Sequence, residues 1–246
     1  MTAFLRQYRD LVSMELRSMR AEVPMVAVIQ AGFTLGFVLG FGYLIPDIRE
    51  QTALYIITGT ATQGLVTIGL VMLPQVLAQS KHEGRLDYFL AMPISREAYL
   101  LALVTVVGLM ALPGIVFCLL FGAWHYGIAL QLSPLFPAVI VLGIASLAGV
   151  GIALAVYSPH QQVTNAATQL IIFYVLFFAP VLMPREQLPA LLRETARFAP
   201  PSYAADAVRA TVTDLPGTHL GASLAAMALF AAGSIALSAV AIRRRG

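Results

Sequence analysis

The chain has 246 residues, of which 59% are hydrophobic and only 11% are charged, and its formal net charge is +3. Soluble globular domains carry about 25% charged residues, and 15 basic plus 12 acidic side chains are too few to cover a soluble protein of this size. The composition therefore excludes a soluble enzyme, a nucleic-acid-binding module and a disordered chain. It predicts an integral membrane protein.

The first 23 residues predict an amphipathic helix at the membrane surface. Apolar residues recur at helical spacing from Phe4 to Met19, and Arg6, Arg9 and Arg17 lie between them. Such a helix lies in the headgroup plane, with its apolar face toward the lipid and its basic face toward anionic headgroups. We expect residues 1–23 to be either an elbow helix that orients the first span or a simple surface anchor.

Six apolar stretches are long enough to cross a bilayer, which requires about 20 residues. With approximate ends, they are Pro24–Ile45, Ala53–Ala78, Tyr99–Gly122, Phe136–Tyr157, Ala166–Leu182 and Leu220–Ile242. None of them contains Asp, Glu, Lys or Arg. The fifth is the shortest, and its helix has room to begin earlier, in a polar stretch. The sequence predicts an all-α polytopic membrane protein with six transmembrane helices in a single domain, residues 1–246.

The basic residues indicate the orientation, because cytoplasmic segments carry an excess of Lys and Arg. With the N-terminus inside, the inner side holds Arg6, Arg9, Arg17, Arg20, Lys81, Arg85, Arg96, Arg243, Arg244 and Arg245. The outer side holds Arg49, Arg185, Arg193, Arg197 and Arg209, four of them in one long loop, where the rule is weaker. Both termini are therefore predicted to be cytoplasmic.

No residue within the expected spans can carry a proton or bind a nucleotide. Ion-coupled transporters place a carboxylate, His or basic group at membrane depth, whereas the four histidines lie at or beyond the span ends. This disfavours a proton-driven antiporter and leaves sodium sites built from carbonyl oxygens open. The single lysine, Lys81, follows Ala-Gln-Ser and cannot complete a phosphate-binding loop, and the single cysteine, Cys118, excludes a multi-cysteine metal site. Energy for uphill transport must therefore come from another chain.

The connection between the second and third spans, residues 79–97, predicts a short amphipathic helix, a turn and a return to the membrane. Leu86 and Phe89 share the apolar face of this helix. Pro93 ends it, and Ser95 is placed to cap the next helix. The residues alone leave two interpretations open: a lever held by a mobile partner, or a solvated loop with an ordinary interfacial helix.

Two motifs resemble the ABC-2-type exporter permeases. The family pattern after the second span is roughly Glu-x-Gly-Thr-Leu-Glu, then Thr-Pro-Val-Ser-Arg. Here Glu83–Asp87 reads Glu-Gly-Arg-Leu-Asp and Met92–Arg96 reads Met-Pro-Ile-Ser-Arg, with Arg85, Asp87 and Met92 as departures. After the fifth span, the proline-containing residues 184–192 and 200–209 are similar to the short extracellular helices of that family, which dip back toward the membrane before the last span.

The resemblance implies that the loop helix is a coupling helix, which docks in a groove of a separate ATP-binding subunit. Leu86 and Phe89 would be its apolar anchors. The full set of implied contact residues is Glu83, Gly84, Arg85, Leu86, Asp87, Phe89 and Arg96. The resemblance also implies a homodimer or related heterodimer of permeases in a bacterial cell membrane, bound to two ATP-binding subunits that hold ATP and Mg. The chain itself would hold no cofactor and bind no nucleic acid.

Small and polar residues inside the spans allow two interpretations each. Gly32, Gly36 and Gly40 form a ridge that permits close helix approach, either within the chain or between two copies. Uncharged polar side chains gather in the second span and at the start of the fifth, where several pairs four residues apart share a face. These residues are Thr58, Thr62, Gln63, Thr67, Thr164, Asn165, Thr168 and Gln169. They line a substrate route between two protomers, or they only form hydrogen bonds within and between helices.

The loop of residues 183–218 contains five prolines and several apolar runs, so we expect half-buried helices that either gate the exit or form a passive cap. Together these features predict the permease subunit of an ATP-driven exporter that moves a hydrophobic or amphipathic substrate out of the cytoplasm or inner leaflet. The alternatives are a non-transporting scaffold or sensor and an intramembrane enzyme, although the span serines have no histidine at membrane depth to activate them.

Overall fold

The computed structural model describes residues 2–45, 48–92, 94–178, 181–182, 189, 194, 196, 199–215 and 219–243. Every regular element in these ranges is a helix, as the composition predicts. The elements are α1 (Thr2–Ser18), α2 (Val23–Leu44), α3 (Glu50–Val66), η1 (Thr67–Met72), α4 (Leu73–His82), α5 (Arg85–Ala91), α6 (Arg96–Leu109), α7 (Leu112–Tyr126), α8 (Phe136–Tyr157), α9 (Gln161–Phe178), α11 (Pro200–Val212) and α12 (Leu220–Arg243).

Four helical segments in the described ranges are long and apolar enough to cross a membrane: Val23–Leu44, Glu50–His82, Arg96–Tyr126 and Phe136–Tyr157. They coincide with the first four expected spans. The helices α9 and α12, of 18 and 24 residues, occupy the positions expected for the fifth and sixth. The polar stretch from Gln161 forms the first turns of α9, so this helix begins earlier than the apolar run, as its short length suggested.

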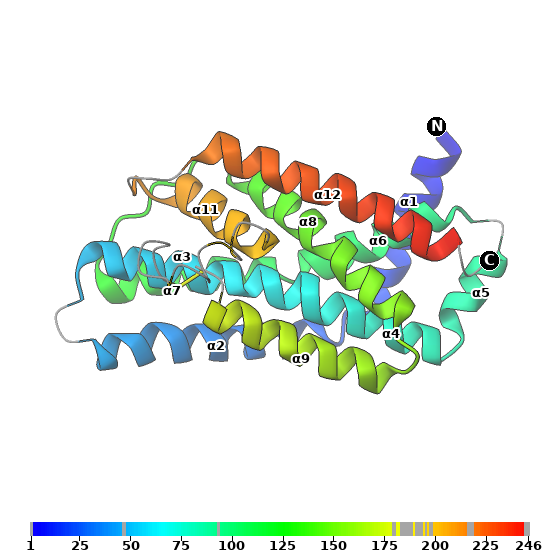
Figure 1. Cartoon of the computed structure of the whole chain (residues 1–246), viewed down its shortest axis with the longest axis horizontal. Coiled ribbons are helices and arrows are strands. Elements are labelled where there is room, and N and C mark those ends of the chain that lie inside the picture. Colours follow the sequence, from blue (N-terminus) through cyan, green and yellow to red (C-terminus); the bar gives the residue numbers. More distant parts are fainter. Residues whose placement is uncertain are drawn as a thin grey trace.

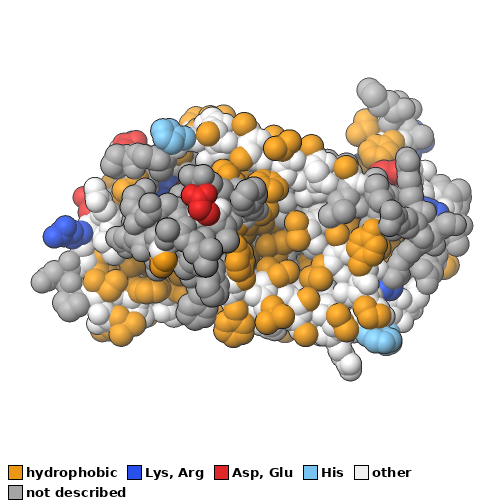
Figure 2. Space-filling view, in the orientation of Figure 1, with side chains coloured by type: hydrophobic (Ala, Val, Ile, Leu, Met, Phe, Trp, Pro, Cys, Tyr) orange, Lys and Arg blue, Asp and Glu red, His pale blue; other side chains and the backbone are white. Residues whose placement is uncertain are grey.

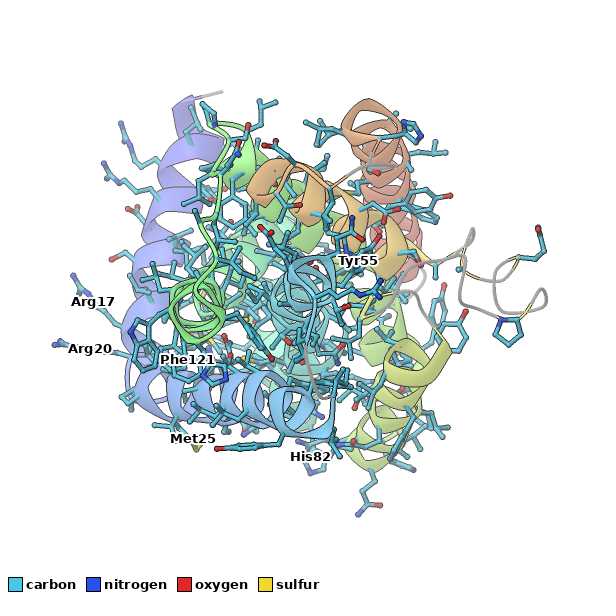
Figure 3. The ribbon with its side chains drawn as sticks, turned by 90° about the vertical axis from the view of Figure 1, so that its left-hand side faces the viewer. Arg17, Arg20, Met25, Tyr55, His82 and Phe121 are labelled. Carbon is cyan, nitrogen blue, oxygen red and sulfur yellow. The ribbon has the colours of Figure 1, made fainter. Side chains whose placement is uncertain are left out.

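The helices α3 and α12 extend along the long axis of the molecule, and both chain ends lie at the same end of it (Figure 1). The helices α1 and α5 lie at this end as well. Seen along the long axis, α7 is viewed nearly end-on, whereas α1 crosses the view and the side chains of Arg17 and Arg20 point away from the bundle (Figure 3). The first helix is thus set across the spans rather than parallel to them.

Charged side chains gather at the two ends of the long axis. On the face drawn in Figure 2, the acidic, basic and histidine side chains lie toward the ends, and hydrophobic side chains cover the region between them. This distribution matches a bilayer, because charged groups are costly in the hydrocarbon layer. The surface therefore agrees with the absence of charge from the expected spans.

The second span changes its helical geometry halfway along. Its segments α3, η1 and α4 form one continuous helix, in which η1 is a π-helical turn and the backbone N–H of Leu73 donates to the carbonyl of Ile68. Pro74 follows directly in the first turn of α4, where it has no N–H to donate. The wide turn accommodates this proline without ending the helix.

The third span is interrupted at Met110, between α6 and α7. Pro113 lies in the first turn of α7, so its missing N–H falls where a helix start leaves such groups unpaired. The backbone N–H groups of Met110 and Ala111 bond to carbonyls three and four residues back, which continues the chain direction across the break. The segments α6 and α7 therefore form one span of 31 residues, Arg96–Tyr126, with a local change of hydrogen bonding at Met110.

Within the expected extracellular loop, residues 183–218, the structure describes residues 189, 194, 196 and 199–215. Within it, α11 is a buried helix of 13 residues that packs against α3, α8 and α12. The alternation of alanines with larger residues suits this position, because Ala204, Ala205 and Ala207 are fully buried. The chain thus returns into the bundle before α12.

The helices α8 and α12 cross at very close range. A Cβ added to Gly149 would lie 2.0 Å from the Cβ of Ser234. The Ser234 hydroxyl donates to the backbone carbonyl of Ser146 over 3.1 Å. Small residues at the crossing therefore allow both close packing and a hydrogen bond between the helices.

Gly149→Ala is expected to destabilise this crossing by about 1–3 kcal/mol, because the added methyl group overlaps the Ser234 side chain. Gly233→Ala is the matched control, since a Cβ there meets nothing within 4 Å. Thermal unfolding of both variants in detergent measures the difference. Equal melting temperatures would contradict the close crossing.

Candidate functional site

The chain between the second and third spans forms the helix, turn and return that its sequence predicts. Gly84 ends the preceding helix with a φ of +74°, a left-handed conformation that glycine adopts without steric cost. The short helix α5 follows. The Ser95 hydroxyl then accepts a hydrogen bond from the backbone N–H of Ala98 over 3.2 Å, which caps α6 as expected.

A buried ion pair fixes α5 to α1. Nη2 of Arg85 lies 3.0 and 3.2 Å from the two carboxylate oxygens of Glu15. The Glu15 side chain is only 2% exposed, whereas that of Arg85 is 40% exposed. The sequence analysis missed Glu15, although its spacing gave a signal. Glu15 lies four residues after Leu11 and four before Met19, so all three share one helical face. An acidic residue therefore interrupts an otherwise apolar buried face.

Of the two apolar residues of α5 that were expected to anchor a partner, Leu86 lies in this chain's own core, whereas Phe89 is half-buried and lines a groove beside α1. Leu86 is buried in the main hydrophobic cluster. The ring of Phe89 stacks on that of Tyr99, with 4.9 Å between centroids. The aromatic side chain that remains accessible is Tyr88, which is 61% exposed and which the sequence did not single out.

The expected polar contacts of α5 have different surroundings. Glu83 is exposed at the start of the turn and accepts a hydrogen bond from Nε2 of Gln79 over 2.8 Å. Arg96 is half-buried at the start of α6, and Gly84 is exposed between them. The side chain of Asp87 lies outside the described part of the chain. Contact of these residues with a partner stays a prediction.

Lys81 holds the end of α8. Its ammonium group donates to the backbone carbonyls of Ser158 over 2.6 Å and of Val156 over 3.4 Å. The last carbonyls of a helix have no partner within the helix and carry partial negative charge, so a cation is favourable there. This contact ties α4 to α8 at the same end of the bundle that carries α5.

A groove of about 450 Å³ runs between α1 and α5. Gln7, Asp10 and Met14 line it from α1, while Tyr88 and Met92 line it from α5 and the residue after it. Beside it, the Tyr8 hydroxyl lies 2.9 Å from that of Thr105 and connects α1 to α6. The accessible side of α5 is thus bordered by a hollow rather than by packed protein.

Three threonines of the second span, Thr58, Thr62 and Thr67, form hydrogen bonds within their own helix. The hydroxyl of Thr58 donates to the carbonyl of Leu54 over 2.7 Å, that of Thr62 to Thr58 over 2.8 Å, and that of Thr67 to Gln63 over 2.9 Å. Thr58 and Thr62 are fully buried within the chain. A role for them in a substrate route remains untested, and their present contacts are those of ordinary membrane-helix threonines.

The polar residues of α9 lie on two different faces, as their spacing predicts. Thr164 and Thr168 are buried, and the Thr168 hydroxyl accepts a hydrogen bond from Nε2 of Gln75 in α4 over 3.1 Å. Asn165 and Gln169 are exposed. The first face holds α9 against α4, and the second is the one accessible from outside this chain.

The glycine ridge of α2 contacts nothing within the described residues. A Cβ added to Gly32, Gly36 or Gly40 would meet no atom within 4 Å. Only Gln30, Thr34 and Val38 of α2 are buried, and Phe33 and Met25 are exposed. Packing inside the chain is therefore not the use of this ridge here.

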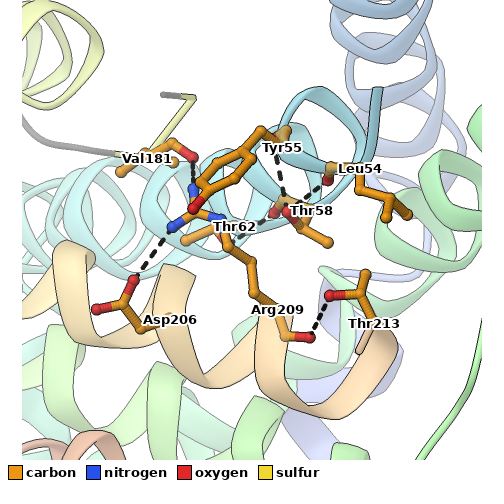
Figure 4. Close-up of polar contacts among 8 residues, drawn as sticks. All are labelled: Leu54, Tyr55, Thr58, Thr62, Val181, Asp206, Arg209 and Thr213. Atoms are coloured by element: carbon orange, nitrogen blue, oxygen red, sulfur yellow. Dashed lines mark hydrogen bonds and ion pairs between the residues drawn. The ribbon is translucent and has the colours of Figure 1, made fainter. Parts of the chain in front are cut away.

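At the opposite end of the bundle, Arg209 holds α11 against α3 (Figure 4). Its guanidinium lies 3.2 Å from the Asp206 carboxylate, donates to the carbonyl of Val181 and lies 4.4 Å from the ring centroid of Tyr55. The side chain is only 2% exposed. From the sequence, Arg209 was only one of the outer basic residues, and nothing in its spacing predicted this burial.

A family model for the ABC-2 type transporter matches residues 6–213. The chain belongs to the ABC-2 type transporter family. The matched region runs from α1 to the end of α11 and includes α5 and both residues of the Glu15–Arg85 pair. A comparison with curated proteins found no match. As an ABC-2 permease, the chain is a membrane-embedded transport subunit of the kind that works with an ATP-binding subunit.

Arg85→Met is expected to destabilise the chain by about 3 kcal/mol, because it leaves the buried Glu15 carboxylate without a partner. Glu15→Gln should cost only about 1 kcal/mol, since water can reach the 40% exposed Arg85 side chain. Thermal unfolding of both variants and of the double variant measures their coupling. Strictly additive effects would contradict a direct pair.

Proposed function

We propose that this chain is half of the membrane portion of an ABC exporter, with six spans and both termini in the cytoplasm. Two permeases, identical or related, bind two ATP-binding subunits that hold ATP and Mg. Closure of those subunits pushes on α5, and the spans respond by moving a hydrophobic or amphipathic substrate outward from the cytoplasm or inner leaflet.

One observation carries the proposal: α5 is exposed on one side and bound to two other elements on its inner side. Arg85 pairs with Glu15 of α1, and Phe89 stacks on Tyr99 of α6. Tyr88 and the groove beside it remain free for a partner surface. A force applied to α5 would therefore reach the crosswise helix and the third span together.

The position of the chain ends supports the orientation. The start of α1, the end of α12 and α5 lie together at one end of the bundle (Figure 1). Most of the basic residues assigned to the inner side in the sequence belong to these elements and their neighbours. We assign this end to the cytoplasm, because cytoplasmic segments carry the excess of Lys and Arg.

The unused glycine ridge on α2 supports pairing of two permeases. A face of small residues lets two helix backbones approach closely when a second helix is supplied from outside the chain. Gly32, Gly36 and Gly40 present such a face without any contact inside this chain. The exposed side chains of Asn165 and Gln169 on α9 would then be candidates for a route between the two permeases.

The serines of the spans favour transport over intramembrane hydrolysis. The Ser146 hydroxyl donates to the carbonyl of Gly143 over 2.8 Å, and that of Ser234 donates to the carbonyl of Ser146. A catalytic serine needs an adjacent base instead. A non-transporting scaffold or sensor would bind the same partner, so transport itself must be measured.

Tyr88→Ala is expected to weaken binding of the co-expressed ATP-binding subunit about tenfold, because exposed aromatic residues often dominate such contacts. Tyr43→Ala is the matched control, since Tyr43 is 88% exposed and lies at the end of α2 away from α5. Titration of the partner onto the permease in nanodiscs measures both affinities. An unchanged affinity for Tyr88→Ala would contradict docking at α5.

In proteoliposomes, the complete complex is expected to move a fluorescent short-chain phospholipid or an amphiphilic dye with ATP, whereas the permease alone should not. ATPase activity stimulated by the same probes, and reduced by Tyr88→Ala, would connect hydrolysis to α5. Partner binding without ATP-dependent flux of any probe would favour the scaffold or sensor.

A further inference from the structure

A small hollow lies between α2, α3, η1 and α7. Its volume is about 20 Å³, and its polar lining consists of Gln30, Thr34, Thr60, Gln63 and Thr67. A space of this size has room for one water-sized group. The proposed function does not use it.

Gln30 is held in one orientation at this hollow. Its Nε2 donates to the backbone carbonyl of Met110 over 3.3 Å, at the break between α6 and α7. Because Nε2 faces Met110, the other amide atom, Oε1, faces Gly114. A Cβ on Gly114 would lie 1.5 Å from that oxygen, so only glycine leaves space for the Gln30 amide.

Three oxygen atoms of the lining have no hydrogen-bond partner in the described part of the chain: Oε1 of Gln30, Oγ1 of Thr60 and Oε1 of Gln63. The three residues are 7%, 5% and 7% exposed. Two of these atoms are amide carbonyl oxygens, which can only accept hydrogen bonds. Buried oxygens left unpaired are costly, so the hollow is chemically suited to a donor.

The hollow lies next to an apolar surface. Phe33 and Phe37 line both the hollow and a shallow groove of about 510 Å³ on the outer face of α2, together with Ile29, Gly32 and Gly36. A molecule with an apolar body on this groove could reach the hollow with a polar end. No side chain of the lining is charged, so the hollow offers nothing to balance an ion.

We propose that this hollow binds one small, uncharged hydrogen-bond donor, an O–H or N–H group, which pairs with the oxygens of Gln30, Thr60 and Gln63. The donor is supplied by the polar end of an amphiphile lying along α2 or by a single water molecule. The site goes beyond the proposed function, because its occupation requires neither an ATP-binding subunit nor transport. Gly32 and Gly36 line the groove and also belong to the face proposed to contact a second permease, so an amphiphile in the groove and a second α2 exclude each other, whereas a water molecule is compatible with both.

The first arm of the test uses a photoreactive long-chain alcohol and its methyl ether on the full chain in nanodiscs. The two probes share their apolar body, but only the alcohol donates a hydrogen bond. We expect the alcohol to label the α2 peptide around Phe33 about three- to tenfold more than the ether, the range that one hydrogen bond supplies.

Two variants and a control test whether the hollow causes the stronger labelling by the alcohol than by the ether. Thr60→Val and Gln63→Leu should remove this difference in labelling. Thr211→Val, which alters a buried threonine of α11 remote from the hollow, should keep the difference.

Thermal unfolding of Thr60→Val also tests whether the hollow is occupied. The substitution should raise the melting temperature if the hollow is empty and lower the melting temperature if a donor pairs with the hydroxyl.

The second arm detects water by hydroxyl-radical footprinting. Ile115 lines the hollow and is 1% exposed, whereas Ile57 is equally buried but does not line it. Equal labelling by the two probes, together with oxidation of Ile115 but not Ile57, assigns the donor to water and supports the site. Equal labelling with Ile115 unoxidised, or a stabilising Thr60→Val, overturns the proposal.

Discussion

The six apolar stretches expected to cross the membrane contain no charged residue, so these parts of the helices must be held together without ion pairs. Lipid tails are as apolar as the helix surfaces, and close contact and hydrogen bonds must therefore supply the specificity. The structure uses both at the crossing of α8 and α12, where Gly149 admits the Ser234 side chain and the Ser234 hydroxyl reaches a backbone carbonyl of α8. The hydroxyls of Thr58, Thr62 and Thr67 instead bond to carbonyls of their own helix.

At the end of the bundle that carries α5, ionic contacts have a smaller desolvation cost because water is near. Two contacts hold together different parts of this end: the Glu15–Arg85 pair and the contact of Lys81 with α8. One part joins α5 to α1 and α6, and the other joins α4 to α8. The turn at Gly84 lies between the two parts.

The sequence predicted those features that depend on local pattern. Span positions follow from hydropathy, and the cap at Ser95 and the break near Pro93 follow from side-chain chemistry. The sequence could not show that Leu86 and Phe89 face inward, because an amphipathic helix has an apolar face whichever surface covers it. Nor could it pair Glu15 with Arg85, which lie 70 residues apart and meet only through the placement of α1.

The π-helical turn at Thr67–Met72 has a consequence for how the two ends of the molecule are aligned. It places one more residue in the turn than an α-helix would, and each residue rotates the helix face by about 100°. On the N-terminal side of this turn, α3 meets α2, α7 and α11, and on its C-terminal side α4 meets α9, while α8 contacts α3, η1 and α4 alike. The turn therefore sets the angular phase between α5 and the buried Arg209 contact. Lengthening or shortening it by one residue would rotate α4 against α3 by about 100° and would force their shared contacts with α8 to repack.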